Sequence, residues 1–442
     1  LLENTSNESW LRSSFVDDAN TSVLLASPHI QHTEKDPGIL RIQEGPERHH
    51  LSPAVIGVGD GRPFFTESYR DFSIAKERDN FATAIAASIV PEVTRLRTKE
   101  EIELHIAKAH EAFPAWRDED PLVRSEVLVK AGDLMRQRRD ELCGVVMQEA
   151  GKTWREADSE VCEAIDFCDY YARMAPPLFE YERLGEFIGE LDQQFYQPRG
   201  VCAVISPWNV PLLLAMIDSL AALSAGCSVL LKPSEVTPRF IEPLQRALDT
   251  VPELASVLHI ITGGPDTGKA MIDQVDAVCF TGSVTTGRDV SQRAAANFIP
   301  AFLELGGKDP ALILPDADLP LAARAIVRSA IGMTGQACQS LERVYCHQDV
   351  AEAFIEEVVG QCQALSLTCT EDGSGDIAPL IFARQVETIQ AQIEDALQKG
   401  ARCLLGGDPV HAGGTWYPPT VLIDVDHDML IMQEETFGPI IP

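Results

Sequence analysis

The sequence has few basic residues and no arrangement of cysteine or histidine that would hold a metal. Its 36 Lys and Arg are outnumbered by 67 Asp and Glu, which gives a formal net charge of −31. Such acidity disfavours nucleic acid and anionic membranes as partners. The 11 cysteines form no CxxC pair and no His-rich tract is present. We therefore predict reduced thiols in the cytoplasm, with neither a disulfide framework nor a metal site.

A secretory signal, an internal repeat and a membrane span are also missing from the pattern. Leu1 begins a polar segment that lacks the basic start of a signal peptide. The most apolar stretch, from Pro211 to Leu231, is long enough to cross a bilayer. Because it contains Asp218 and Gly226, we predict instead a buried helix followed by a strand.

At 442 residues the chain is expected to form two or three domains. Residues 1–15 look like the end of a helix, and residues 16–70, rich in Pro, Gly, His and charge, are predicted to be a linker. Thr98 and Glu101 then predict a capping box at the start of a helix. Further amphipathic helix is predicted over Leu122–Met147 and Asp158–Tyr171.

Short apolar runs that alternate with helical patterns predict an α/β fold with a parallel, doubly wound sheet. Each run ends in Gly, Pro, Ser or Thr and leads into a helical pattern. The stretch Gly185–Tyr196 alternates like a β-hairpin and precedes the first of these strands. The predicted strands are Val201–Ile205, Ser228–Leu231, Leu258–Ile261, Ala277–Phe280 and Ala311–Leu314.

Polar residues follow several of these strands, where ligands bind in open parallel sheets. The amide of Asn209 could donate to a developing oxyanion, or it could simply cap the next helix. Lys232 and Glu235 suit the hydroxyls of a ribose, although an ordinary surface turn would have the same composition. Ser283 stands in a glycine-containing turn, not a GxGxxG pattern, and opens a helix whose N-terminus can receive a pyrophosphate.

A glutamate and a cysteine could supply a base and a nucleophile. Glu304 is a lone carboxylate in an apolar run, so we expect it at the rim of a cleft or with a raised pKa. Cys338 follows 34 residues later. A soft nucleophile and a carboxylate that activates water suit thioester chemistry on a carbonyl. Free cysteines, however, are often no more than small buried hydrophobic residues.

Taken in order, these motifs resemble the NAD(P)-dependent aldehyde dehydrogenase superfamily over about residues 71–442. The resemblance implies a Rossmann-like NAD-binding domain over residues 71–305, with a hairpin at about 185–198 that serves oligomerisation. It also implies a homo-oligomer and a catalytic domain over residues 306–442 that is incomplete at its C-terminus. The motifs are Pro207-Trp208-Asn209, Lys232-Pro233-Ser234-Glu235, Phe280-Thr281-Gly282-Ser283, Glu304-Leu305-Gly306-Gly307-Lys308, Gly335-Gln336-Ala337-Cys338 and Glu435-Thr436-Phe437-Gly438-Pro439.

The same resemblance implies roles for individual residues. Cys338 would attack an aldehyde, Asn209 would hold the oxyanion, and Glu304 would activate the water that hydrolyses the thioester. Glu235 would repel a 2′-phosphate, which favours NAD over NADP. The implied cofactor contacts are Ile205, Ser206, Trp208, Lys232, Ser234, Glu235, Gly264, Gly282, Ser283, Leu305, Gly306, Glu435 and Phe437.

A second resemblance concerns the substrate. Leu1–Arg12 and Asp71-Phe72-Ser73 resemble bifunctional proline utilization A enzymes, in which a barrel with FAD oxidises proline and a second module oxidises glutamate γ-semialdehyde. Residues 1–15 would then be the tail of that barrel, and FAD would bind only in barrel residues outside this chain. Gln339, the expected substrate contact, replaces the serine usual in dedicated glutamate-semialdehyde enzymes. It favours a general aldehyde or succinate-semialdehyde dehydrogenase, and a non-catalytic scaffold of the same fold is a remote alternative.

Overall fold

A computed structural model of the protein describes residues 58–59, 64–93, 98–185, 188–368, 373–411 and 414–442. All of them belong to one compact unit that spans residues 54–442. The predicted barrel tail at residues 1–15 and most of the predicted linker lie outside the described residues. The last part of that stretch, residues 64–70, is neither helix nor strand and is tied to a later helix, because the Arg70 N–H donates to Asp158 Oδ2 at 2.9 Å.

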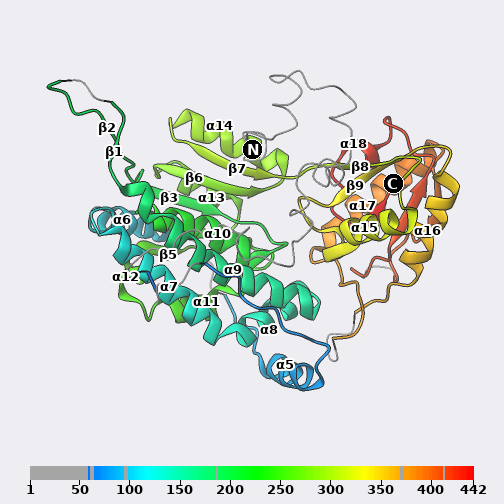
Figure 1. Ribbon diagram of the computed structural model, residues 1–442, viewed down its shortest axis with the longest axis horizontal. Helices are drawn as coiled ribbons and strands as arrows, with labels where there is room; N and C mark the ends of the chain where they lie inside the picture. Colours follow the sequence, from blue (N-terminus) through cyan, green and yellow to red (C-terminus); the bar gives the residue numbers. More distant parts are fainter. Residues whose placement is uncertain (1–57, 60–63, 94–97, 186–187, 369–372, 412–413) are drawn as a thin grey trace, which may run out of the picture. The chain divides into compact units, whose positions relative to one another are not determined.

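A five-stranded parallel sheet organises the first part of this unit. Its strand order is β5-β4-β3-β6-β7, so the chain builds outward on one side of β3 and then continues on the other side. The reversal between β3 and β6 leaves a crevice at the carboxyl ends of the strands. The strands are β3 (Val201–Ile205), β4 (Ser228–Lys232), β5 (Leu258–Ile260), β6 (Ala277–Gly282) and β7 (Ala301–Leu305) (Figure 1).

The two faces of this sheet are buried by different helices. Val201 and Ala203 of β3 belong to one core and Cys202 and Val204 to the other, since successive side chains of a strand point to opposite faces. The first core includes α6 (Lys99–Arg117), α13 (Pro265–Ile272) and α14 (Val284–Ala296). The second core includes α5 (Ala75–Ala87), α7 (Pro121–Gln137), α8 (Arg139–Ala150), α9 (Trp154–Met174), α10 (Pro211–Ser224), α11 (Ile241–Leu248) and α12 (Pro252–Val257).

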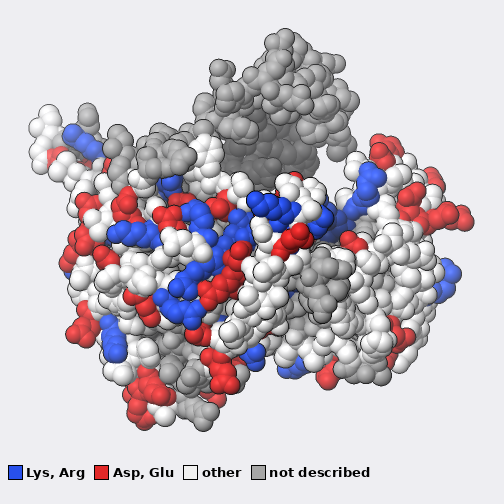
Figure 2. Space-filling view, turned by 90° about the horizontal axis from the view of Figure 1, so that it is seen from below, with Lys and Arg blue, Asp and Glu red and all other residues white. Residues whose placement is uncertain are grey.

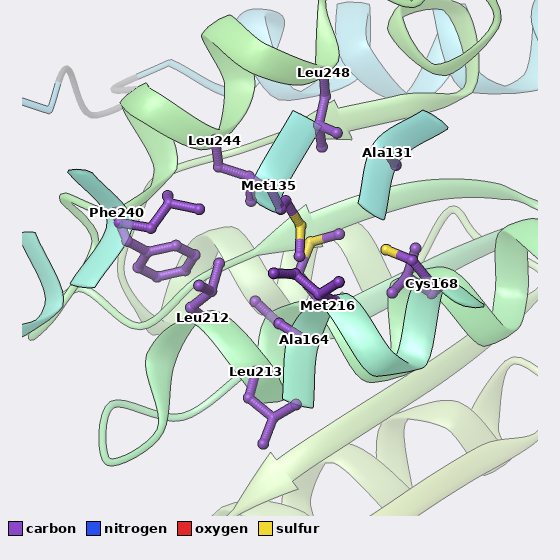
Figure 3. Close-up of a cluster of buried hydrophobic side chains, with 14 of the residues drawn as sticks. Ala131, Met135, Ala164, Cys168, Leu212, Leu213, Met216, Phe240, Leu244 and Leu248 are labelled. Atoms are coloured by element: carbon purple, nitrogen blue, oxygen red, sulfur yellow. The ribbon is translucent and has the colours of Figure 1, made fainter. Parts of the chain in front are cut away.

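The helical core beneath the sheet is formed by α7, α9, α10 and α11. Figure 3 shows apolar side chains from these helices pointing toward one another. Full burial of a side chain the size of Leu or Met stabilises a protein by about 1.5–3 kcal/mol, so this cluster fixes how α9 and α10 pack. The labelled residues are Ala131, Met135, Ala164, Cys168, Leu212, Leu213, Met216, Phe240, Leu244 and Leu248.

The apolar stretch Pro211–Leu231 folds as predicted, into a buried helix and a strand. α10 ends at Ser224, and Gly226 then adopts a left-handed φ of 87° that turns the chain into β4. Throughout the described ranges, no helix combines the length and the apolar composition that crossing a bilayer requires.

A second α/β assembly follows β7. β8 (Asp309–Ile313) pairs in parallel with β9 (Leu341–Cys346), while β10 (Arg402–Leu405), β11 (Thr420–Ile423) and β12 (Ile440–Ile441) form a separate sheet. The Val344 N–H donates to the Pro442 carbonyl at 3.3 Å and links the two. The helices that complete the two cores of this assembly are α15 (Leu319–Ile331), α16 (Ala351–Gln363), α17 (Ala383–Gln398) and α18 (Leu430–Gln433).

Several element predictions can be compared with this structure. The capping box of Thr98 and Glu101 is confirmed. The helical pattern predicted over Leu122–Met147 is confirmed as two helices, because Arg138 leaves helical geometry (φ −109°, ψ 15°) between α7 and α8. The strand predicted at Ala311–Leu314 exists as β8 but not in the doubly wound sheet. The predicted hairpin is present with short strands, β1 (Glu182–Arg183) antiparallel to β2 (Gln193–Gln194).

Basic side chains are concentrated on the surface. Figure 2 shows them gathered in a band across the middle of one face, with acidic side chains beside them. Many form ion pairs: Arg70 and Arg139 both contact the carboxylate of Asp158, whose side chain is only 2% exposed. Several basic groups among the described residues therefore have a carboxylate partner.

Candidate active site

A cleft of about 820 Å³ opens at the carboxyl ends of β3, β4 and β6, where the strand order reverses. Eight of the 13 predicted cofactor contacts line it together. Gly264 does not line it, but caps α13 immediately before Pro265, which does. The eight residues are Ile205, Ser206, Trp208, Lys232, Ser234, Glu235, Gly282 and Ser283.

Polar groups in this cleft are arranged to meet a dinucleotide. Lys232 Nζ donates to Glu235 Oε2 at 3.3 Å, so a cation and a carboxylate lie side by side at the end of β4. This pair suits ribose hydroxyls, which accept hydrogen bonds from an ammonium and donate them to a carboxylate. Ser283 caps α14, and the first turn of a helix attracts phosphate. Among the described residues, the buried Ser206 hydroxyl finds no hydrogen-bond partner. A polar ligand would satisfy it, so these residues fit a dinucleotide.

A second cleft, of about 600 Å³, brings Cys338, Glu304 and Asn209 together. It shares Trp208, Gly282 and Ser283 with the first cleft, so the two are continuous. The Trp208 ring meets the Phe437 ring edge to face, with centroids 5.4 Å apart. The four remaining predicted cofactor contacts line this second cleft: Leu305, Gly306, Glu435 and Phe437.

Cys338 differs from the other described cysteines because it is exposed, while they are buried or half-buried. Its Sγ donates to Gln339 Oε1 at 3.1 Å. The surrounding protein still removes water from the thiol, and this desolvation raises the pKa of Cys338 above its ordinary value. The backbone N–H groups of Cys338 and Gln339 oppose that rise, whereas the charges of Glu435 and Glu304 add to it. A nucleophile at this position would therefore have to lose its thiol proton before it attacks at neutral pH.

Asn209 positions the loop that carries Cys338. Its Nδ2 donates to the Gln336 carbonyl at 2.9 Å, and its side chain is buried. The alternative that Asn209 caps α10 is wrong, because Val210 is the N-cap and makes no side-chain cap. An amide nitrogen has two N–H donors, so one remains to serve a ligand beside Cys338.

The backbone before Cys338 is strained and firmly held. Met333, Thr334 and Gly335 have left-handed φ angles of 54°, 58° and 69°, which are costly for residues other than glycine. The Met333 N–H donates to Glu156 Oε1 at 2.9 Å, and Thr334 Oγ1 donates to the Ala378 carbonyl at 2.8 Å. A Cβ at Gly335 would collide with the Gly438 carbonyl oxygen, so only glycine fits there.

Glu304 is exposed and lines the second cleft. This agrees with the expectation that a lone carboxylate in an apolar run lies at the rim of a cleft. It is the fourth residue of β7 and stands opposite Thr281 of β6 in the parallel register. The end of β7 thus places a carboxylate in the same cleft as Cys338.

Glu435 lies against the backbone at the end of β7, and a Cβ at Gly306 would collide with its carboxylate. Burial raises the pKa of Glu435 to about 7, and the charge of Glu342 adds to the rise. The Gly307 N–H and the Lys308 ammonium lower it. Glu435 is therefore partly protonated at neutral pH.

Sequence reasoning missed Glu342, which holds the turn of Glu435 and Phe437 in place. The buried Glu342 carboxylate accepts the N–H groups of Thr436 and Phe437 at 2.7 and 2.8 Å and the Lys308 ammonium at 2.8 Å. Phe437 has a left-handed φ of 51°, so the turn needs this support. The available signal was a carboxylate inside an apolar strand, the same signal that singled out Glu304.

A third cleft, of about 570 Å³, also reaches Cys338 and Asn209 and includes Gln339, the predicted substrate contact. α9 lines it with Arg155, Ser159 and Glu163 at intervals of four residues. These were not predicted, because helical spacing shows which residues share a face but not what that face meets.

The fold and the clefts define an α/β protein in which a cleft fit for a dinucleotide adjoins an exposed cysteine. The chain belongs to the aldehyde dehydrogenase family, whose sequence profile matches residues 84–442. Members of this family are NAD(P)-dependent oxidoreductases, and this protein is an enzyme of that class.

Several relatives and solved structures show how similar the chain is to other members. The 1-pyrroline-5-carboxylate dehydrogenase 1 of Halalkalibacterium halodurans is 35% identical over 352 residues, which cover 77% of this chain and 67% of that protein. A Mycobacterium ulcerans protein with the provisional name succinate-semialdehyde dehydrogenase (NADP(+)) 2 is 35% identical over 353 residues, which cover 78% of this chain and 67% of that protein. A structure described provisionally as the aldehyde dehydrogenase PutA of Anabaena variabilis is 40% identical, with a TM-score of 0.77, covering 80% of this chain and 75% of that one.

Proposed function

We propose that the protein oxidises L-glutamate γ-semialdehyde to L-glutamate with NAD, the second step of proline catabolism. The observation that carries the chemistry is that Cys338, Glu304 and Asn209 line one cleft, which continues into the dinucleotide cleft. The substrate assignment is supported by the similarity to 1-pyrroline-5-carboxylate dehydrogenases and to the PutA structure.

The residues of the second cleft suit each step of this reaction. The Cys338 thiol gives its proton to water, and its Sγ attacks the carbonyl carbon, while the Asn209 amide and the Cys338 N–H donate to the oxyanion that forms. Bound NAD supplies the acceptor for the hydride that leaves when the oxyanion collapses to a thioester on Cys338. Glu304 then takes a proton from water, which attacks the thioester carbon. The C–S bond breaks, and glutamate and the free Cys338 thiol are released.

The first cleft would hold the cofactor. Lys232 and Glu235 suit the adenosine ribose, and Ser283 at the start of α14 suits the pyrophosphate. Glu435 suits the hydroxyls of the second ribose, beside the aromatic wall of Trp208 and Phe437.

Glu235→Ser is expected to raise the use of NADP relative to NAD by about tenfold or more, because it removes a carboxylate that would face a 2′-phosphate. The ratio of kcat/KM for the two cofactors measures this effect. Glu253→Ser, on an exposed part of α12 away from the clefts, is the matched control and should leave the ratio unchanged. An equal ratio in Glu235→Ser and the unmodified enzyme would show that Glu235 does not select NAD.

Succinate semialdehyde is the second candidate substrate. Gln339 stands beside the nucleophile and contacts its sulfur, where dedicated glutamate-semialdehyde enzymes place serine. The Mycobacterium ulcerans relative is named for this substrate.

Turnover of the intact protein with the two semialdehydes decides between them. We expect kcat/KM to be higher for glutamate γ-semialdehyde by about tenfold or more, equivalent to about 1.4 kcal/mol of transition-state binding. A dominant preference for succinate semialdehyde would contradict the substrate assignment but would leave the cysteine chemistry in place.

A further inference from the structure

We propose that Arg155 and Arg328 form a binding site for a carboxylate at the far end of the substrate, in the third cleft. The inference rests on the proposed function, since it takes Cys338 as the point where the aldehyde reacts. It deepens that function by naming the substrate class: aldehydes that carry an acid group. The two arginines come from different helices, α9 and α15, and both line the cleft that reaches Cys338.

The acidic groups near this cleft are largely occupied by protein partners. Asp158 is paired with Arg70 and Arg139. Glu160 contacts Lys152 Nζ at 2.5 Å, and its other oxygen accepts the Leu212 N–H at 2.7 Å at the start of α10. Glu160 thus ties α9 to α10, and Asp158 ties α9 to α8, so neither carboxylate is available to neutralise further arginines.

Glu156 is occupied in the same way. Its Oε2 accepts the Thr153 N–H at 2.9 Å in the capping box of α9, and its Oε1 accepts the Met333 N–H. Because Glu156 ties the Cys338 loop to the first turn of α9, its neighbour Arg155 stands where α9 meets that loop.

The side chains of Arg155 and Arg328, in contrast, form no ion pair and no hydrogen bond with any residue in the described ranges. Both side chains are exposed to solvent, and both line the third cleft. Arg70, Arg136, Arg139 and other arginines each contact a carboxylate in this strongly acidic chain. Two unpaired guanidinium groups beside one nucleophile are suited to a ligand carboxylate, whose two oxygens match the planar fork of arginine.

Arg328 lies in the last turn of α15, ten residues before Cys338. Arg155 is the second residue of α9. The segment that carries Cys338 therefore follows the helix of one arginine and is tied to the helix of the other. Gln339 lines the same cleft, and its amide can add a hydrogen bond to the acid.

Glu163 places a carboxylate in the third cleft, away from Arg155. Its Oε1 accepts hydrogen bonds from Ser159 Oγ at 3.1 Å and Tyr69 Oη at 3.5 Å, and it has no basic partner among the described residues. It lies eight residues after Arg155 on the same helix, which separates their backbones by about 12 Å. Its negative charge repels an acid group, so a substrate carboxylate is directed to the arginine end.

The test compares two aldehydes of equal chain length in the intact protein: glutamate γ-semialdehyde and pentanal, which lacks the acid. Arg155→Gln and Arg328→Gln are each expected to lower kcat/KM for the acidic aldehyde by about 10- to 100-fold, mainly through KM, because hydrogen bonds between charged groups have that range. Turnover of pentanal should change by less than about threefold, as it makes no such bond. Arg324→Gln is the matched control, one turn earlier on α15 and outside the cleft.

A second measurement uses the unmodified enzyme, so its result does not depend on whether the arginine variants fold. Raising the ionic strength should lower kcat/KM for glutamate γ-semialdehyde and leave that for pentanal unchanged, because salt screens exposed charges. The assignment is overturned if both aldehydes respond alike to the arginine variants or to salt. An unmodified enzyme that oxidises neither aldehyde overturns the proposed function itself, and the arginine assignment with it.

Discussion

Cys338→Ala should abolish aldehyde-dependent formation of NADH, with kcat lower by about 10⁴-fold or more, and leave NAD binding intact. Removing a nucleophile stops covalent catalysis altogether, and what remains in other enzymes is only residual catalysis from the binding site. The dinucleotide cleft is lined by residues after β3, β4 and β6 and does not include Cys338. Turnover is measured by NADH absorbance, and binding by calorimetry with NAD.

Cys346→Ala is the control for this experiment. Cys346 is half-buried at the end of β9 and lines none of the three clefts, so its removal should leave turnover nearly unchanged. Full activity in Cys338→Ala would rule out the cysteine mechanism, whatever the control showed.

Glu304→Gln should slow steady-state turnover by about 10²- to 10⁴-fold, the usual contribution of a general base, while the first turnover survives. The reason is that Glu304 is assigned to the water that hydrolyses the thioester, a step after hydride transfer. Rapid mixing with saturating aldehyde and NAD should therefore show a burst of about one NADH per active site, followed by a slow phase.

Glu356→Gln, on exposed α16 and outside the clefts, is the matched carboxylate control and should show no change in either phase. If Glu304→Gln lost the burst together with turnover, Glu304 would act before hydride transfer, and its assignment to hydrolysis would be wrong.

The sheet could be predicted closely because its strands are continuous apolar runs. The predicted Val201–Ile205 and the start of β4 at Ser228 agree with the structure, since strands buried on both faces leave a strong signal. The assignment of Ala311–Leu314 to the same sheet was wrong because periodicity does not encode a pairing partner. That strand pairs with β9, about 30 residues later in the chain.

The site could be predicted only in part, for a related reason. Cys338, Asn209 and Glu304 were found through motifs whose order resembles one family. Arg155, Arg328 and Glu342 stand in ordinary helical or strand patterns. Only tertiary packing brings the two arginines to a cleft and Glu342 to the turn that contains Phe437. The same holds for the contact of Asn209 with the Gln336 carbonyl, which joins residues 127 positions apart.

Mass spectrometry of Glu304→Gln after mixing with glutamate γ-semialdehyde and NAD tests the central claim most directly, because hydrolysis is then slow enough for the intermediate to accumulate. The account predicts a thioester on the peptide that contains Cys338, with a mass increase equal to the aldehyde less two hydrogen atoms. An unmodified Cys338 alongside NADH formation, or an adduct on a different residue, would contradict it.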